Sequence, residues 1–151
     1  MTVTVNGLGE LKALAGSDLG SSDWIEVTQE RVDTFADATG DHQWIHVDPE
    51  RAKEGPFGAP IAHGYLTLSL FIPLFTGLLD VQGVTTKVNY GLDKVRFPAP
   101  VTVGSRLRLA ARLADVTDVP GGVQITVDGT LEIDGGAKPA AVLRSLSRFY
   151  A

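Results

Sequence analysis

Residues 35–79 read FADATGDHQWIHVDPERAKEGPFGAPIAHGYLTLSLFIPLFTGLL, a polar half followed by an apolar half. The polar half places four titratable side chains within eight residues: Asp41, His42, His46 and Asp48. The apolar half opens at His63-Gly64 and continues as the mostly apolar segment 65–79. Titratable groups followed by a long apolar segment indicate a reaction site built against a hydrophobic slot.

Composition limits the classes of protein that the chain can belong to. Its 151 residues predict one domain, 1–151, and 44% hydrophobic residues are enough for a core. The net charge of −5 argues against a general nucleic-acid binder, which would carry a basic surface. Because the chain has no cysteine, disulfides, thiol nucleophiles and cysteine-ligated zinc are excluded.

No segment predicts a membrane protein. The N-terminus MTVTVNGLGELKALAG lacks the basic start and apolar core of a signal peptide. The segment 65–79 is shorter than the roughly 20 residues that span a bilayer, and it contains Pro73. We therefore expect a cytoplasmic protein with neither membrane nor nucleic acid as a partner, and a buried helix at 65–79.

Helix signals surround the polar half. Thr28 is a typical N-cap for a helix that ends at Gly40, and residues 41–47 are expected to form an irregular loop. Asp48-Pro49 is a good start for another short helix. A long helix is expected from Gly64 to about residue 79, with a break near residue 69 because Pro73 cannot donate a backbone hydrogen bond.

Period-two alternation dominates the rest of the chain. Residues 1–23 read as a lead segment with a short helix, and 24–27 as a short strand. Alternating apolar residues after residue 80 predict antiparallel strands at 85–90, 92–97, 105–116, 123–133 and 140–150. The expected fold is α+β, with a sheet curled around the long helix. Because that helix is apolar all round, a second copy of the chain would cover its remaining face.

Asp41 and His46 can serve as a general acid–base pair. They lie five residues apart in the expected loop, close enough for both side chains to meet at one water molecule. The residues alone leave a second interpretation open, in which Asp41 caps a turn and His46 is a buried structural histidine. A metal site made of His42, His46, Asp48 and His63 has less support, because Gly40 and Pro49 disfavour helical His-x-x-x-His geometry.

His63-Gly64 stands where the long helix begins and its backbone N–H groups lack acceptors. A free N–H at Gly64 can stabilise a developing oxyanion, but the glycine can equally serve close packing. Basic residues on the later strands can hold phosphates of a carrier or form a solvated outer face: Lys94, Arg96, Arg106, Arg108 and Arg112. No serine-nucleophile elbow and no phosphate-binding glycine loop occurs.

Two blocks of sequence resemble a known family. Residues 35–48, FADATGDHQWIHVD, followed by IAHG at 61–64, are similar to the MaoC-like hydratases, which include (R)-specific enoyl-CoA hydratases and NodN-like proteins. YGLDKVRFPAPV at 90–101 resembles a later block of the same family. The resemblance covers residues 24–115 well and is closest to actinobacterial members. It implies the hot-dog fold, in which a curled antiparallel sheet wraps a long central helix, in a homodimer.

The resemblance also implies an activity. Family members add water to a trans-2-enoyl thioester or remove it from an (R)-3-hydroxyacyl thioester, carried by CoA or acyl-carrier protein. Asp41 and His46 would be catalytic, Gly64 and His63 would bind the thioester carbonyl, and no metal or other cofactor would be needed. Arg96 and Lys94 are candidate contacts for the carrier's phosphates.

The chain departs from the family pattern at two positions. Gln43-Trp44 stands where the family usually has Asn-Pro, which affects the expected shape of the loop and the acyl-chain preference. This departure leaves open a non-catalytic protein that binds acyl thioesters. An acyl-CoA thioesterase on the same fold is a further alternative, because the fold alone does not decide the activity.

Overall fold

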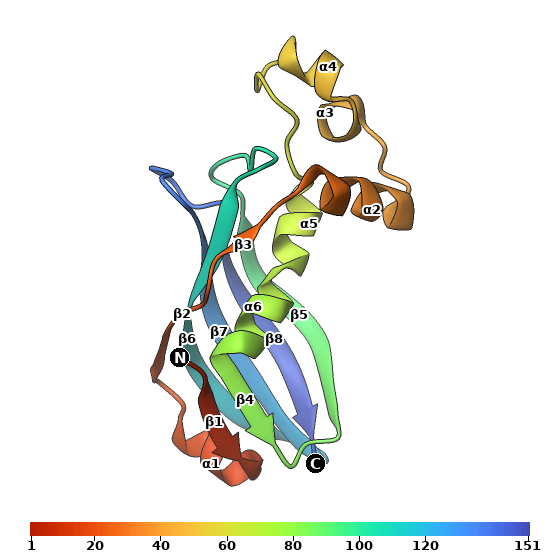
Figure 1. Cartoon of the computed structure of the whole chain (residues 1–151). Helices are drawn as coiled ribbons and strands as arrows, with labels where there is room; N and C mark the ends of the chain where they lie inside the picture. The colour runs from red at the N-terminus through yellow and green to blue at the C-terminus, as the bar shows by residue number, and fades with distance from the viewer.

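The computed structural model describes all residues, 1–151. A six-stranded sheet curls around two consecutive helices, and a two-stranded sheet, β1-β4, lies beside it (Figure 1). The elements in chain order are β1 (Val3–Asn6), α1 (Gly7–Ala13), β2 (Asp18–Ser21), β3 (Ile25–Glu26), α2 (Gln29–Thr39), α3 (Trp44–Val47), α4 (Pro49–Lys53), α5 (Gly64–Ser69), α6 (Phe71–Leu78), β4 (Leu79–Gln82), β5 (Thr86–Arg96), β6 (Arg106–Val119), β7 (Gly122–Ile133) and β8 (Ala141–Tyr150).

The main sheet follows the order β2-β6-β7-β8-β5, and β3 also pairs with β6. All of these pairings are antiparallel, as the alternating pattern predicts. Strand β5 runs unbroken from Thr86 to Arg96, so the expectation of two separate strands there is wrong. Register shifts on both sides of Gly91 let one strand bend through the region where the alternation is interrupted.

The inner face of the sheet and the helices α5 and α6 form the core. Alternate residues of β6 and β7 are fully buried, among them Leu107, Leu109 and Ile125. Phe71 and Leu74 of α6 belong to the same apolar cluster. The expected α+β architecture, with the sheet wrapped around the central helix, is confirmed.

The central helix is broken where the sequence predicts a break. α5 ends at Ser69 and α6 begins at Phe71, which places Pro73 in the first turn of α6. Proline is tolerated there because the first N–H groups of a helix have no intrahelical acceptor. The helix is shorter than expected at its end, since Leu79 already starts strand β4.

The N-terminal residues pack into the same apolar cluster. Val5, Leu11 and Leu19 are buried in it. Strand β1 pairs in parallel with β4, with Val3 opposite Leu79, and β2 pairs with β6. No helix in the chain is both long and apolar enough to cross a bilayer.

Candidate functional site

Asp41 is placed by the end of helix α2. Thr28 caps the start of that helix by accepting a hydrogen bond from the N–H of Arg31, and Gly40 ends it at a φ of +80°. The left-handed conformation of Gly40 turns the chain out of the helix, as expected of a glycine C-cap. The exposed Asp41 follows directly, and its Oδ1 accepts a hydrogen bond of 3.4 Å from the backbone N–H of Gln43.

His46 is buried on α3, a single helical turn in the region expected to be an irregular loop. Its Nδ1 lies 2.7 Å from the carbonyl oxygen of Ile61. A carbonyl can only accept, so Nδ1 must carry the hydrogen and donate it. In the neutral ring, Nε2 therefore keeps a free lone pair, which is the form that a general base requires.

His63, the residue before α5, contacts both Asp41 and His46. The side chain is only 2% exposed, and its Nε2 donates to the backbone carbonyl of Asp41 at 3.0 Å. Its ring stacks on His46 with 3.9 Å between centroids and packs against Phe35 at 4.9 Å. The Nδ1 atom is buried and has no hydrogen-bond partner in the protein. His63 therefore holds Asp41 and His46 in one compact cluster.

The cluster brings together residues that are up to 22 positions apart in the chain. One carboxylate oxygen of Asp41 and one ring nitrogen each of His46 and His63 lie within 4.8 Å of one another. A water molecule placed among them can contact both the carboxylate and an imidazole.

The pKa of His46 is lowered from its ordinary value of 6.5. Burial is the largest cause, because it disfavours the charged ring, and the neighbouring His63 lowers the pKa further. The Ile61 carbonyl and the Asp41 charge oppose this shift without cancelling it. His46 is thus kept neutral, and able to accept a proton, at neutral pH.

The same three side chains, Asp41, His46 and His63, are the group that could offer ligands to a metal ion. The two imidazole rings stack at an angle of only 26°. A ring nitrogen binds a metal through a lone pair in the plane of its ring. Because the two ring planes are nearly parallel, the two lone pairs do not readily point at one ion. The arrangement favours acid–base chemistry over metal binding.

Gly64 places a backbone N–H beside the cluster, at the first position of α5. The preceding residues are fixed to a loop at the sheet, since Ala62 N–H donates to Val101 O at 2.8 Å. A Cβ on Gly64 would lie only 3.2 Å from the ring of Phe97, so a larger residue here would have to displace that ring. A small cavity next to Gly64 is lined by Phe57, Thr67 and Phe97, among others.

His42 and Asp48 do not belong to the cluster, and each contacts a different partner. His42 Nε2 lies 2.9 Å from the carboxylate of Asp37, in an exposed pair that raises the pKa of His42. Asp48 caps α4 by accepting from the N–H of Arg51, as its position before Pro49 predicts. The wider four-residue metal site considered from the sequence is therefore not assembled.

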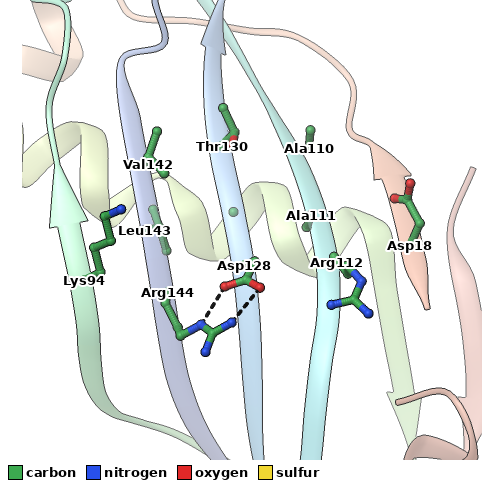
Figure 2. Close-up of a pocket in the computed structure, with 11 residues that line it drawn as sticks. Asp18, Lys94, Ala110, Ala111, Arg112, Asp128, Thr130, Val142, Leu143 and Arg144 are labelled. Atoms are coloured by element: carbon green, nitrogen blue, oxygen red, sulfur yellow. Dashed lines mark hydrogen bonds and ion pairs between the residues drawn. The ribbon is translucent and has the colours of Figure 1, made fainter. Parts of the chain in front are cut away.

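Lys94 lies on the outer face of the sheet, opposite to the helix (Figure 2). It belongs to a row of charged residues that crosses five strands in register: Lys94, Arg144, Asp128, Arg112 and Asp18. Arg144 donates two hydrogen bonds to Asp128, at 2.7 and 2.9 Å, and these chiefly lower the pKa of Asp128. The structure does not bring Lys94 together with the cluster.

The other basic residues of the strands differ in their surroundings. Arg106 pairs with Asp134, and Arg108 pairs with Glu132 at 3.1 Å, which fits the alternative of a solvated outer face. Arg96 is instead adjacent in sequence to Phe97, the residue that packs on Gly64. Arg96 and Lys94 are two positions apart on β5 and pair with Val142 and Arg144 of β8, so both lie on the outer face of the sheet.

Sequence reasoning missed the side chain of Gln29. Its Nε2 donates to the backbone carbonyl of His46 at 2.8 Å. No motif signals such a role, because the two residues are 17 positions apart and the contact involves a backbone atom. Trp44 is one of the residues that depart from the family pattern. The guanidinium carbon of Arg51 lies 4.3 Å from the centroid of the Trp44 ring.

Comparison with known proteins places these features in a family. Residues 10–134 match the family model described as MaoC like domain. The chain is 55% identical over 149 residues to 3-hydroxyacyl-thioester dehydratase Z of Mycobacterium tuberculosis, covering 98% of this chain and 99% of that protein. It is 46% identical over 136 residues to nodulation protein N of Rhizobium leguminosarum bv. viciae, covering 88% and 84%.

Two solved structures show the same fold. The monoamine oxidase regulatory protein from Archaeoglobus is 24% identical, with a TM-score of 0.78 over 99% of this chain and 97% of that one. The (R)-hydratase from A. caviae is 23% identical, with a TM-score of 0.71 over 88% and 94%. The chain therefore belongs to the MaoC-like family and has the hot-dog fold that its sequence resemblance implied.

Proposed function

We propose that the protein is an (R)-specific enoyl-thioester hydratase, a hydro-lyase that also catalyses the reverse dehydration of (R)-3-hydroxyacyl thioesters. The observation that carries the proposal is the state of His46: its Nδ1 donates to Ile61, which leaves a lone pair on Nε2, and one of its ring nitrogens lies within 4.8 Å of an Asp41 carboxylate oxygen. The 55% identical relative from M. tuberculosis is named as a 3-hydroxyacyl-thioester dehydratase, which agrees with this chemistry.

The reaction needs one water molecule and one proton transfer to carbon. Asp41 and His46 hold the water through a carboxylate oxygen and the Nε2 lone pair, and one of the pair takes its proton as oxygen attacks the β carbon. The electrons of the double bond move toward the thioester carbonyl. The pair then returns a proton to the α carbon, so that the elements of water are added without a cofactor.

Gly64 is the proposed oxyanion contact. Its N–H, at the start of α5, would donate to the thioester oxygen as that oxygen gains charge. The His63 side chain is buried and already bonded to Asp41, so we assign it to the shape of the site rather than to substrate contact. The position of Arg96 next to Phe97 supports it as the contact for the phosphates of CoA or an acyl-carrier protein.

We also propose that the protein works as a cytoplasmic homodimer. Strand β5 is the last strand of the sheet, so one edge of it is unpaired. The apolar side chains Tyr90 and Leu92 of β5 are exposed, as are Tyr65 and Ile72 of the central helices. A second copy pairing along this edge would cover both the strand and the helix face.

The direct test mixes the pure protein with a short and a medium-chain trans-2-enoyl-CoA and follows the loss of the conjugated-thioester absorbance. Asp41→Asn and His46→Gln are assayed in parallel, and a thiol reagent reports free CoA. We expect the wild-type protein to lower the absorbance without releasing thiol, and we expect neither variant to lower it. The magnitude expected for either variant is a loss of roughly 10²–10⁴-fold in rate.

The two alternatives give different results in the same assay. A thioesterase would release free thiol, and a non-catalytic binding protein would bind the enoyl thioester without any change in absorbance. Either outcome would overturn the hydratase proposal while leaving the family and fold in place.

A further inference from the structure

Helix α3, which carries His46, is too short to be stable by itself. It consists of the four residues Trp44–Val47. Isolated helices of this length do not persist in water, because nucleation fixes several residues for one hydrogen bond. The position of His46 relative to Asp41 must therefore depend on groups outside α3.

The carbonyl groups of α3 show which outside groups hold it. The oxygens of Gln43 and Trp44 accept from N–H groups at the end of the same turn. The oxygen of Ile45 accepts from the N–H of Ile61 at 3.0 Å, and the oxygen of His46 accepts from Gln29 Nε2 at 2.8 Å. Two outside groups thus donate to the carbonyls of α3: the side chain of Gln29 and the backbone N–H of Ile61.

The Gln29 amide is itself held in one orientation. Besides bonding His46 O, its Nε2 donates to Oδ1 of Asp33, one turn later on α2, at 2.9 Å. Both partners can only accept, so the amide nitrogen, and not the amide oxygen, must face them. Gln29 is the first residue of α2, directly after the N-cap Thr28, and it is half-buried. It therefore links the capped end of α2 to the turn that carries His46.

We infer that Gln29 is a positioning residue for the acid–base pair. Its amide fixes the backbone at His46 from one side, while the Ile61 carbonyl fixes the imidazole from the other. Together they fix both the backbone and the ring of His46 within the cluster that it forms with Asp41. The inference rests on the proposed hydratase function and adds a group that does not contact the substrate.

The test replaces the amide by a side chain of similar length that cannot donate, Gln29→Met. A displacement of about 1 Å at a reacting group can cost about 10²-fold in rate. We therefore expect kcat for enoyl-CoA hydration to fall about 10- to 100-fold, with KM changed less than about threefold, since substrate contacts are intact. The melting temperature should fall by only about 2–4 °C, because the variant loses the half-buried bond to His46 O together with the exposed bond to Asp33, which contributes little in water.

A matched control is available at Gln82, an exposed residue at the end of β4, whose Nε2 donates to Asp80 Oδ2 at 2.6 Å. Gln82→Met removes the same type of amide–carboxylate bond and should leave kcat unchanged. A second readout is independent of turnover: ¹⁵N-edited NMR of the His46 ring follows the Nδ1–H that is bonded to Ile61. In Gln29→Met that proton should exchange with water faster than in the wild type.

The outcomes separate the inference from the function on which it rests. Wild-type kcat in Gln29→Met, or a fall equal to that of Gln82→Met, would overturn the positioning role. A lower melting temperature with unchanged His46 exchange and unchanged kcat would assign Gln29 to stability alone. If the wild-type protein does not hydrate enoyl-CoA, the proposed function fails, while the exchange of the His46 proton still tests whether Gln29 holds the ring.

Discussion

At the scale of single residues, burial decides the charge of His46. The ring is 6% exposed, and desolvation is the main reason why its pKa lies below 6.5. His42, only four positions earlier, is exposed and has its pKa raised, chiefly by a hydrogen bond to Asp37. Two histidines of one segment therefore shift in opposite directions, and only the buried one is suited to accept a proton at neutral pH.

The first prediction concerns the pH dependence of activity. Because the pKa of His46 is lowered, the plot of kcat/KM against pH should stay level above 6.5 and fall only at lower pH, as the ring becomes protonated. Steady-state rates with one enoyl-CoA across the acid and neutral range measure this. Asp37→Asn changes only the environment of His42 and should leave the profile in place. An acid limb centred above 6.5 would contradict the assignment of His46.

The second prediction concerns stability, with opposite signs for the two histidines. His46 binds a proton near pH 6.5 in the unfolded chain but only at lower pH in the folded chain. Protonation of the unfolded chain therefore lowers the free energy of unfolding as pH falls below 6.5. His42 binds its proton more tightly when folded, so its contribution is present below 6.5 and is lost as pH rises through its raised pKa. Urea unfolding of His46→Gln and His42→Gln against wild type, over this pH range, should show the two opposite trends. Trends of the same sign would be inconsistent with this account.

At the scale of elements, helix α2 matters because both of its ends serve the site. Its start presents Gln29 to the turn that carries His46, and its end at Gly40 releases Asp41. The φ of +80° at Gly40 belongs to the left-handed region, which costs other residues roughly 1–2 kcal/mol. The C-terminal stop of α2 is thus also a determinant of where the carboxylate lies.

The third prediction compares two glycine substitutions. Gly40→Ala should lower the free energy of unfolding by about 1–2 kcal/mol and reduce kcat, since Asp41 follows directly. Gly9 lies inside α1 with ordinary dihedral angles, and an added Cβ would meet nothing within 4 Å. Gly9→Ala should therefore raise stability, by up to about 1 kcal/mol, and leave kcat alone. Chemical denaturation and the hydration assay measure both, and equal effects of the two changes would refute the argument.

Local sequence patterns predicted the elements whose signals are local. The cap at Thr28, the stop at Gly40 and the break before Pro73 follow from single-residue backbone chemistry. Helix α3 was not predicted, because Trp-Ile-His-Val has weak helix propensity and two of its carbonyls bond to Ile61 and Gln29, which are distant in the chain. Strands β1, β2 and β4 are short, and β1 pairs with residues more than 70 positions away, which no local pattern encodes.

The same difference between local signals and distant contacts applies to the site. Asp41 and His46 were identified from their spacing and from the family resemblance, and the structure brings them together. The tautomer of His46 required knowledge of its contact with Ile61 O, and the role of Gln29 required the fold. Lys94 was chosen for its charge, but the alternation of the strand places it on the outer face (Figure 2).

At the scale of the whole molecule, one side of the curled sheet remains open. Nearly every residue of β5 is exposed, and the cavity between β5 and the central helices is lined by Ile72, Tyr90 and Leu92, among others. An exposed strand edge next to apolar side chains is a surface on which chains associate. This is the surface that the proposed homodimer would bury.

The fourth prediction tests that dimer. Light scattering coupled to size-exclusion chromatography should give twice the mass of the 16.0 kDa chain. Leu92→Lys places a charge in the proposed interface and should shift the protein toward the monomer and lower its activity. Thr117→Lys, at an exposed position of β6, should change neither. A wild-type protein that is monomeric at assay concentration would refute the dimer without affecting the assignment of Asp41 and His46.

The pairing of β1 with β4 has a consequence for how the chain reaches its native state. Val3 pairs with Leu79, and this pairing closes a long segment of chain, which carries an entropic cost that local contacts do not. On a ribosome, β1 emerges well before β4 and stays unpaired while the segment that carries Asp41 and His46 is synthesised. β1 can therefore dock only after β4 has been synthesised, beside the strand that follows the central helices (Figure 1).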